Sequence, residues 1–453
     1  MKRGFATAAW SLCLLSAALS QTSAPPPNAK DVSAPARPSV PASQKDASAV
    51  GGVLSALDAV RIALERQPTL ESARQAVIAA QGRSQQLRSL LLPHLGVVGT
   101  YGSSMFIGNE PRLDLSIVNG YGTSATVTQL IFDGSHANDL LRQAGALKTV
   151  AAEDLNKAKQ DLALQALAGY YIVGEARRLV TVNERNVANR DSQLDLARAR
   201  FGSGLGGPDD VLTAQTAKDD AVIQLVQART TEDSAVVSLL QTLGLDPQTP
   251  VKVGEDGADP VTIDKFDEFV AKALDRRPEV LRAKASIDAA HFGARAARTI
   301  AGPVLAGSAW FGTNDPGYPW GGAGYGLGLS LSVPLYDGGL TAGAVKEADA
   351  TLKSAKSDLL TAQLQVRTDV SQSYLALRGA EQQDHIAKIN VDNARESLRI
   401  AEGRYKSGLG LFLDIINAQA ALVAAETNAA TAQAQVFQQR ATLQHAAGLL
   451  VQR

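Results

Sequence analysis

Four short stretches of the chain have a β-like pattern of residues, and in the last of them hydrophobic and polar residues alternate with a period of two, which predicts four β-strands. The strands are expected at about residues 95–107, 120–132, 304–312 and 322–335. In the last stretch, one face carries Leu327, Leu329, Leu331 and Val333, and the other carries Gly328, Ser330 and Ser332. One oily face and one small, polar face are typical of a wall between lipid and water.

Hydrophobic residues recur at helical spacing in the remaining segments. A helical pattern covers about residues 54–92, is interrupted at Pro68 and ends before Pro93. After each strand pair, a proline-free helical pattern follows, over about residues 135–201 and 340–405. At about 1.5 Å per residue, each of these helices would be roughly 100 Å long. A compact domain cannot bury such a helix, so we expect a coiled coil or a tube.

Each long helix is followed by a returning helix with an alanine at every seventh position. The returning helices cover about residues 209–243 and 413–449. Their alanines are Ala214, Ala221, Ala228 and Ala235 in the first helix, and Ala418, Ala425 and Ala432 in the second. A strict seven-residue repeat keeps one seam of a helix against its partner, and alanine lets the two backbones approach closely.

The order of these elements is duplicated, and the clearest sign is a motif that occurs twice. Arg200-Phe201-Gly202-Ser203-Gly204-Leu205 reappears 204 positions later as Arg404-Tyr405-Lys406-Ser407-Gly408-Leu409. The same separation joins Asp210 to Asp414 and Asn186 to Asn390. The sequence therefore predicts two structural repeats, at residues 51–245 and 263–453, with a junction at 246–262 between them.

The N-terminal region differs in composition from the repeats. Two basic residues precede a short apolar stretch, which predicts a cleaved secretory signal at residues 1–20, with cleavage after Ala24 as the alternative. The single cysteine, Cys13, lies inside this stretch, so we expect the exported chain to have no disulfide. Residues 21–50 are rich in proline, alanine and serine and lack a hydrophobic period, which predicts a disordered leader.

Charge and candidate chemistry argue against several classes of function. The formal net charge is -1, which disfavours a nucleic-acid partner. The histidines stand singly, and no phosphate-binding glycine loop opens a helix, so we expect no metal, no cofactor and no enzymatic activity. After the signal, no run reaches the roughly 18 uncharged apolar residues of a membrane helix, so entry into a bilayer would require β-strands.

Four strands cannot close a barrel, because about eight are needed before the interior has room even for packed side chains. Open sheet edges are not tolerated in lipid, so several copies of the chain must share the wall. Three copies would supply twelve strands and a closed pore, with the helices continuing the wall outside the membrane.

The signal, the two tandem halves, the strand pairs before very long helices and the Arg-aromatic-x-x-Gly-Leu motif followed by aspartate together resemble the TolC-like outer-membrane factors. The resemblance covers about residues 54–448. It implies a mainly α-helical fold with a transmembrane β part: a homotrimer with a twelve-stranded β-barrel in the outer membrane, an α-helical barrel across the periplasm, and an equatorial zone at the repeat junction. It also implies a passive conduit of a tripartite efflux pump or type I secretion system, opened by a periplasmic adaptor and an inner-membrane transporter.

Each Ser-Gly-Leu turn would then form a tip of the tunnel, where a long helix reverses into its returning helix. The plain role of Gly204 and Gly408 is to supply the left-handed conformation that ends a helix. In similar proteins such turns dock against the adaptor. Gly204, Leu205, Gly408 and Leu409 are therefore the candidates for partner contact.

The carboxylates after these turns are the candidates for a pore constriction. The resemblance places Asp414 facing the pore near its closed end, where threefold symmetry would form a ring that attracts cations. The alternative is an ordinary acidic residue at a helix N-terminus, and both roles can hold at once. Asn417 stands where many relatives have a second pore aspartate, so this ring would carry less charge, and Gly410 stands where some have a basic residue that latches the closed state. Asp209 and Asp210 in the other half could compensate.

Two further groups of residues stand near the strands. Asp133 and Asp337 precede the long helices and are predicted to cap them. An aromatic cluster in the second strand pair consists of Trp310, Tyr318, Trp320 and Tyr325. An interfacial aromatic belt and ordinary packing within the sheet are both open for this cluster.

Two other classes of protein contain long helical hairpins. A periplasmic adaptor normally carries one hairpin between β-rich domains, whereas this chain duplicates its helices. A structural coiled coil without a pore does not explain the alternation from Leu327 to Val333. The sequence therefore favours the channel, with drugs, metals, peptides and polysaccharides all open as its cargo.

Overall fold

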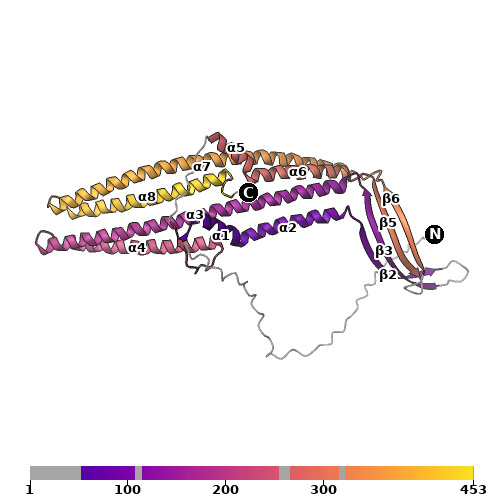
Figure 1. The fold of residues 1–453 in the computed structure, drawn as a ribbon, viewed down its shortest axis with the longest axis horizontal. Coiled ribbons are helices and arrows are strands. Elements are labelled where there is room, and N and C mark those ends of the chain that lie inside the picture. The colour runs from indigo at the N-terminus through magenta and orange to yellow at the C-terminus, as the bar shows by residue number, and fades with distance from the viewer. Residues whose placement is uncertain (1–52, 108–114, 255–265, 316–321, 452–453) are drawn as a thin grey trace, which may run out of the picture. The chain divides into compact units, whose positions relative to one another are not determined.

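The computed structural model describes residues 53–107, 115–254, 266–315 and 322–451. The predicted signal and leader, and part of the predicted junction, lie outside these residues. Two series of elements follow the same order: two short helices, a strand pair, a very long helix and a returning helix (Figure 1). The first series has α1 (Ala56–Arg66), α2 (Pro68–Ser89), α3 (His136–Gly202) and α4 (Pro208–Leu243), and the second has α5 (Phe266–Arg276), α6 (Pro278–Arg298), α7 (Leu340–Lys406) and α8 (Phe412–Ala446). None of these described helices is both long enough and apolar enough to cross a membrane.

The helices α3 and α7 each run for 67 residues without interruption, as the proline-free patterns predict. An aspartate shortly before each helix binds its free amides. Asp133 Oδ2 accepts a hydrogen bond from the Ala137 amide at 2.6 Å, and Asp337 Oδ2 accepts one from the Thr341 amide at 2.8 Å. These bonds satisfy amides that have no partner within the helix, which is the predicted capping role.

The returning helices α4 and α8 run alongside α3 and α7, respectively (Figure 1). The heptad alanines are all at least half-buried: Ala214, Ala221 and Ala432 are buried, and Ala228, Ala235, Ala418 and Ala425 are half-buried. Small side chains at these positions allow the close approach of neighbouring helices.

The second short helix of each series begins at a proline and continues from the end of a returning helix. Gln67 and Arg277 stand directly before these prolines in an extended conformation. Gln67 Nε2 donates to the Thr242 carbonyl at the end of α4, at 3.2 Å. Arg277 Nη1 donates to the Ala446 carbonyl at the end of α8, at 3.3 Å. Side chains therefore join α4 to α2 and α8 to α6.

The four longer strands form one antiparallel sheet in the order β2-β3-β5-β6. Their bounds are β2 (His94–Ile107), β3 (Leu115–Phe132), β5 (Val304–Asp315) and β6 (Ala323–Ser332); β1 (Val53–Leu54) and β4 (Lys252–Val253) form a separate parallel pair. The predicted strands are confirmed, although β3 begins at Leu115 rather than near residue 120. In the described part of the chain, β2 and β6 are the sheet edges, and each has one neighbouring strand.

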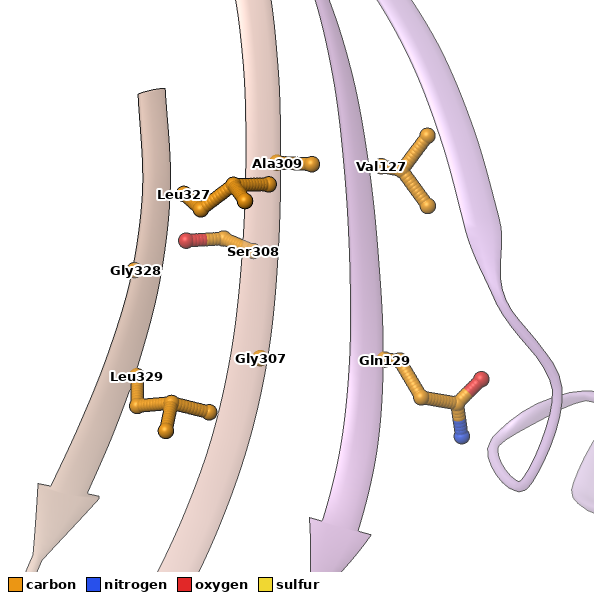
Figure 2. Close-up of a pocket in the computed structure, with 8 residues that line it drawn as sticks. All are labelled: Val127, Gln129, Gly307, Ser308, Ala309, Leu327, Gly328 and Leu329. Carbon is orange, nitrogen blue, oxygen red and sulfur yellow. The ribbon is translucent and has the colours of Figure 1, made fainter.

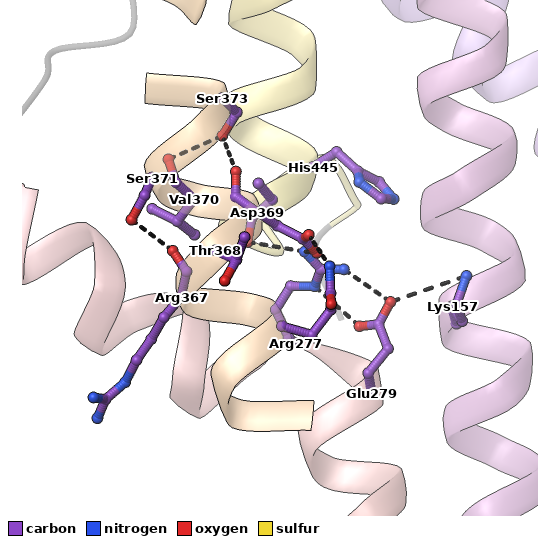
Figure 3. Close-up of polar contacts among 12 residues, drawn as sticks. Lys157, Arg277, Glu279, Arg367, Thr368, Asp369, Val370, Ser371, Ser373 and His445 are labelled. Atoms are coloured by element: carbon purple, nitrogen blue, oxygen red, sulfur yellow. Dashed lines mark hydrogen bonds and ion pairs between the residues drawn. The ribbon is translucent and has the colours of Figure 1, made fainter. Parts of the chain in front are cut away.

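An ionic network centred on a buried arginine joins the two repeats beside the start of α6 (Figure 3). The side chain of Arg277 is 7% exposed and binds Glu279 at 2.9 Å and Asp369 of α7 at 3.2 Å. Lys157 of α3 lies 3.9 Å from the Glu279 carboxylate. Burial alone would raise the pKa of Glu279, but the hydrogen bonds and positive charge of Arg277 outweigh it and hold this pKa below its ordinary value. Glu279 is therefore charged at neutral pH and balanced by Arg277.

Candidate functional site

The two tip turns share one backbone structure. Gly204 and Gly408 have φ of 73° and 76°, in the left-handed region that favours glycine. The amides of the following leucines, Leu205 and Leu409, donate back to the carbonyls of Arg200 and Arg404, at 2.9 Å and 2.8 Å, in the manner of a Schellman turn. The side chains of Leu205 and Leu409 are 71% and 82% exposed. The turns thus present two uncovered leucines at the ends of the helix pairs.

Tyr405 joins the end of α7 to the first helix pair. Its ring centre lies 4.5 Å from the guanidinium carbon of Arg200, and its hydroxyl donates to Asp210 Oδ2 at 3.0 Å. Arg200 also donates to the carbonyls of Tyr405 and Leu205. Burial, followed by the hydrogen bond to Asp210, raises the pKa of Tyr405 to about 12. The hydroxyl therefore keeps its proton, and this donor role, well above neutral pH.

Sequence analysis identifies Asp210 but misses its partner Tyr405 and the arginine, Arg200, that packs on the Tyr405 ring. Tyr405 and Arg200 both lie in the repeated motif, where Tyr405 takes the place of Phe201. The hydroxyl that distinguishes Tyr405 from Phe201 is the feature of the sequence that could have indicated a polar contact here, because a buried tyrosine normally places its hydroxyl against a polar partner. The identity of that partner requires the structure, since Asp210 belongs to the other repeat.

The candidates for a pore constriction occupy two helix starts. Asp209 and Asp210 lie in the first turn of α4; Asp210 binds Tyr405, and Asp209 is exposed. Asp414 lies in the first turn of α8 and accepts a hydrogen bond from the Leu411 amide at 3.1 Å. Asn417 is exposed three residues later, on the same side of the helix. Asp414 therefore has the ordinary N-terminal role, while its side chain stays open to solvent.

The two faces of the sheet carry different side chains (Figure 2). Val127, Ala309 and Leu327 stand opposite one another in β3, β5 and β6, so they share a face. Leu329 continues this face, and the two leucines are 88% and 76% exposed. Residues on the other face alternate with them, as Ser308 does opposite Gly328. A shallow hollow on the sheet is lined by Val127, Gln129, Gly307, Ser308, Ala309, Leu327, Gly328 and Leu329. The leucine face therefore suits an apolar surrounding.

Trp310 and Tyr325, two members of the aromatic cluster, lie on opposite faces of the sheet. In the sheet register Trp310 stands opposite Gly326, whereas Tyr325 stands opposite Phe311 on the leucine face. A Cβ atom on Gly326 would lie 2.5 Å from the Trp310 Nε1 atom, so the indole covers the glycine directly. Trp310 is thus on the small-residue face, because adjacent strand residues point to opposite sides. The other two members of the cluster, Tyr318 and Trp320, lie outside the described residues.

Metal-binding side chains do not gather in the part of the chain that the structure describes: no group of three or more histidine, cysteine, aspartate or glutamate residues comes together there. Two histidines contact protein groups instead. His136 Nδ1 lies 2.9 Å from the Ala296 carbonyl, and His445 Nε2 lies 2.8 Å from Asp161 Oδ1. These contacts connect helices and give both histidines a structural role.

Comparison with known proteins places this arrangement among related chains. Residues 59–245 and 269–449 match the family model described as outer membrane efflux protein. The outer membrane efflux protein BepC of Brucella suis is 26% identical over 337 residues, which cover 73% of this chain and 72% of BepC. Outer membrane protein TolC of Escherichia coli is 28% identical over 395 residues, covering 82% and 78%. The crystal structure of VceC from Vibrio cholerae is similar in fold, with a TM-score of 0.76 at 18% identity, covering 87% of this chain and 96% of VceC.

Proposed function

Since this chain belongs to the outer membrane efflux protein family and is an outer-membrane channel of efflux or type I secretion, we propose that three copies form one passive conduit. The channel lies in the outer membrane, with its helices in the periplasm. A periplasmic adaptor and an inner-membrane transporter dock at the helix tips, open the conduit and supply the energy for transport. The chain itself performs no reaction.

The main support for this proposal is the four-stranded sheet. It has four strands, an exposed leucine face and two edges without a further strand in the described chain. An edge in lipid would leave backbone groups without hydrogen-bond partners, and four strands are about half of the smallest closed barrel. Three copies would join β6 of one chain to β2 of the next. The leucines would then face lipid, and the glycines and serines would face the water-filled interior.

The helix starts after the tip turns are proposed to form the narrow end of the conduit. Under threefold symmetry, Asp414 and Asn417 would recur around the axis, as would Asp209 and Asp210. Closely spaced carboxylates repel one another and attract cations. Asp210 already accepts a hydrogen bond from Tyr405, whereas the side chain of Asp414 is exposed, so Asp414 would be the carboxylate more open to passing cations.

Replacing Tyr405 with phenylalanine is expected to open this end. The change removes the hydroxyl that binds Asp210 and keeps the ring against Arg200. A hydrogen bond to a charged group contributes about 1.5–3 kcal/mol, so the open fraction should rise roughly tenfold or more. Conductance of the purified channel in planar bilayers measures this change.

The matched control is Tyr336→Phe, because Tyr336 is 89% exposed and stands before α7, far along the chain from the tip. Its conductance should equal that of the unchanged channel. Equal conductance of Y405F and the unchanged channel would show that the Tyr405 hydroxyl does not hold the tip closed.

Aspartate at both Leu205 and Leu409 is expected to weaken adaptor binding without disturbing the fold. Both side chains are exposed, so the change removes no packing within the chain. Covering a leucine contributes about 1.5–3 kcal/mol, so each change should weaken binding roughly tenfold or more. Crosslinking to the cognate adaptor in cells measures the loss. The control is Leu57→Asp, at a similarly exposed leucine of α1, which should leave crosslinking unchanged. An equal loss of crosslinking in both variants would show that the adaptor does not dock at the tips.

A further inference from the structure

Four buried polar side chains gather where α3 packs against α8. Asn186, Arg190 and Gln193 lie on α3, and Gln419 lies on α8. Each of these residues is at most 7% exposed in the single chain. Their burial does not depend on a further copy, because both helices belong to the same chain. We name these four residues the arginine-amide cluster.

Hydrogen bonds connect the members of the arginine-amide cluster. Gln419 Nε2 donates to Asn186 Oδ1 at 3.1 Å, and Gln193 Nε2 donates to Gln419 Oε1 at 3.5 Å. Arg190 Nη1 donates to Gln193 Oε1 at 3.2 Å, and Arg190 Nη2 donates to the Ile416 carbonyl of α8 at 3.4 Å. Both of these acceptors are neutral, so Arg190 is the single charged group of the cluster.

One part of the Arg190 guanidinium is left without a partner. A guanidinium has five N–H donors, no acceptor, and a positive charge that it keeps at every physiological pH. The Arg190 Nε atom is buried and has no hydrogen-bond partner among the described residues. An unpaired donor in a buried, charged group destabilises the fold unless something accepts its hydrogen bond.

The charge of Arg190 is not balanced by a carboxylate of the described chain. Burial lowers the pKa of Arg190, and no neighbouring acid opposes this shift. Asp191, the next residue in the sequence, binds Lys218 of α4 at 2.5 Å instead. Arg277, the other buried arginine among the described residues, binds two carboxylates. Arg190 is therefore the buried arginine that lacks a counter-ion within the chain.

The duplication shows that the helices can carry this pattern without the positive charge. Asn186 corresponds to Asn390 of α7, 204 positions later, and Gln419 corresponds to Gln215 of α4. Arg190 corresponds to Ala394, so the guanidinium occurs in the first repeat alone. A buried charge at a position where the other repeat has alanine is more than a requirement of helix packing.

We propose that the arginine-amide cluster binds one chloride ion between α3 and α8. Chloride supplies the single negative charge that Arg190 requires, and it accepts hydrogen bonds without donating any. The guanidinium Nε–H is free to donate to it, and each carboxamide has two N–H donors, of which the bonds above use at most one. A divalent oxyanion would replace an unbalanced positive charge with an unbalanced negative one. The ion would stabilise the folded chain whatever the number of copies.

The stability of the purified, detergent-solubilised channel tests this proposal. Unfolding by urea is measured while sodium gluconate is replaced by sodium chloride at constant ionic strength, because gluconate is too large for a buried site. Above its Kd, an anion that binds only the folded chain lowers the unfolding constant about tenfold per site for each tenfold rise in concentration. The unchanged channel should show this dependence on chloride.

Two variants of the cluster should lose the dependence on chloride for different reasons. Arg190→Met removes the charge that attracts the ion. Gln193→Glu keeps the arginine and places a carboxylate where the Gln193 carboxamide accepts its bond, so the chain supplies its own counter-ion. The control is Arg185→Met, at an exposed arginine of the same helix, and it should keep the full dependence.

Crystals soaked in sodium bromide locate the ion, because bromide replaces chloride and scatters anomalously. A bromide peak within hydrogen-bond distance of Arg190 Nε is expected in the unchanged channel and not in Gln193→Glu. A water molecule at this position, or an equal dependence on chloride in the control and in both cluster variants, would overturn the proposal. A bromide peak together with chloride-independent stability would mean binding at crystal concentration only, and would overturn it as well.

Discussion

Arginine in place of Leu329 is expected to abolish insertion of the channel into the outer membrane. Leu329 lies on the apolar face of β6 and is 76% exposed in the single chain. Arginine on the lipid face of a β-barrel near the membrane midplane costs about 2–4 kcal/mol, and three copies would each carry the change. Fractionation of cells followed by detection of the heat-resistant trimer in the outer membrane measures insertion.

The control for this change is its neighbour in the sequence. Ser330 is on the opposite face of β6, opposite Ala306 of β5, and is also exposed. Ser330→Arg should insert normally and alter the conductance of the open pore instead, because its charge would stand in the water-filled interior. Normal insertion of the Leu329→Arg channel, or failure of both variants, would contradict the assignment of the two faces.

Methionine in place of Arg277 is expected to destabilise the chain by about 3–5 kcal/mol, since a buried ion pair that loses one partner leaves an uncompensated charge. The change removes the ion pairs of Arg277 with Glu279 and Asp369 and its hydrogen bond to the end of α8. Methionine preserves most of the side-chain volume, so the effect would come from charge and hydrogen bonding. Chemical denaturation of the detergent-solubilised channel measures the change.

An exposed arginine provides the comparison. Arg399 binds Glu396 at 2.6 Å, but these side chains are 73% and 54% exposed. Arg399→Met should therefore change the stability by less than about 1 kcal/mol. A similar loss for both variants would mean that burial is not what makes the Arg277 network strong.

Acid should narrow the gap between the Arg277→Met variant and the unchanged channel. The pKa of Glu279 is lower in the folded chain than its ordinary value of 4.5, so its ion pair stabilises the fold above that value. This contribution is lost as the pH falls from about 4.5 through the lower folded pKa, because the carboxyl then takes up a proton. A gap that stays constant over this range would contradict the role of Glu279.

The long helices and the strand pairs could be predicted from the sequence because their signals are local. The absence of proline from residues 135–201 marks one uninterrupted helix, and α3 differs from that range by one residue at each end. The alternation from Leu327 to Ser332 likewise marks a strand with two unlike faces. The duplication strengthens these predictions, because the elements expected in one half of the chain are expected again in the other.

Contacts between distant segments could not be predicted in the same way. The bond between Tyr405 and Asp210 depends on how the helix pair α7 and α8 packs against the pair α3 and α4, and hydrophobic spacing does not encode that packing. The face of Trp310 depends on the register between β5 and β6, because a shift of one residue would move its indole to the leucine side. Arg277 has one partner nearby in the sequence, Glu279, but its other two partners come from α7 and α8.

The side-chain joints at Gln67 and Arg277 have a mechanical consequence. The Gln67 bond connects α4 to α2, and the Arg277 bond connects α8 to α6. Each connected pair of helices leads from a tip turn to the sheet, the first to β2 and the second to β5. The hydrogen bond of Gln67 comes from a neutral amide, whereas the guanidinium of Arg277 also forms ion pairs with the carboxylates of Glu279 and Asp369. Charge-assisted bonds resist displacement more strongly, so the connection between α4 and α2 is the more compliant one and that between α8 and α6 the stiffer one. A torque applied at the tips would therefore reach the two halves of the sheet unequally.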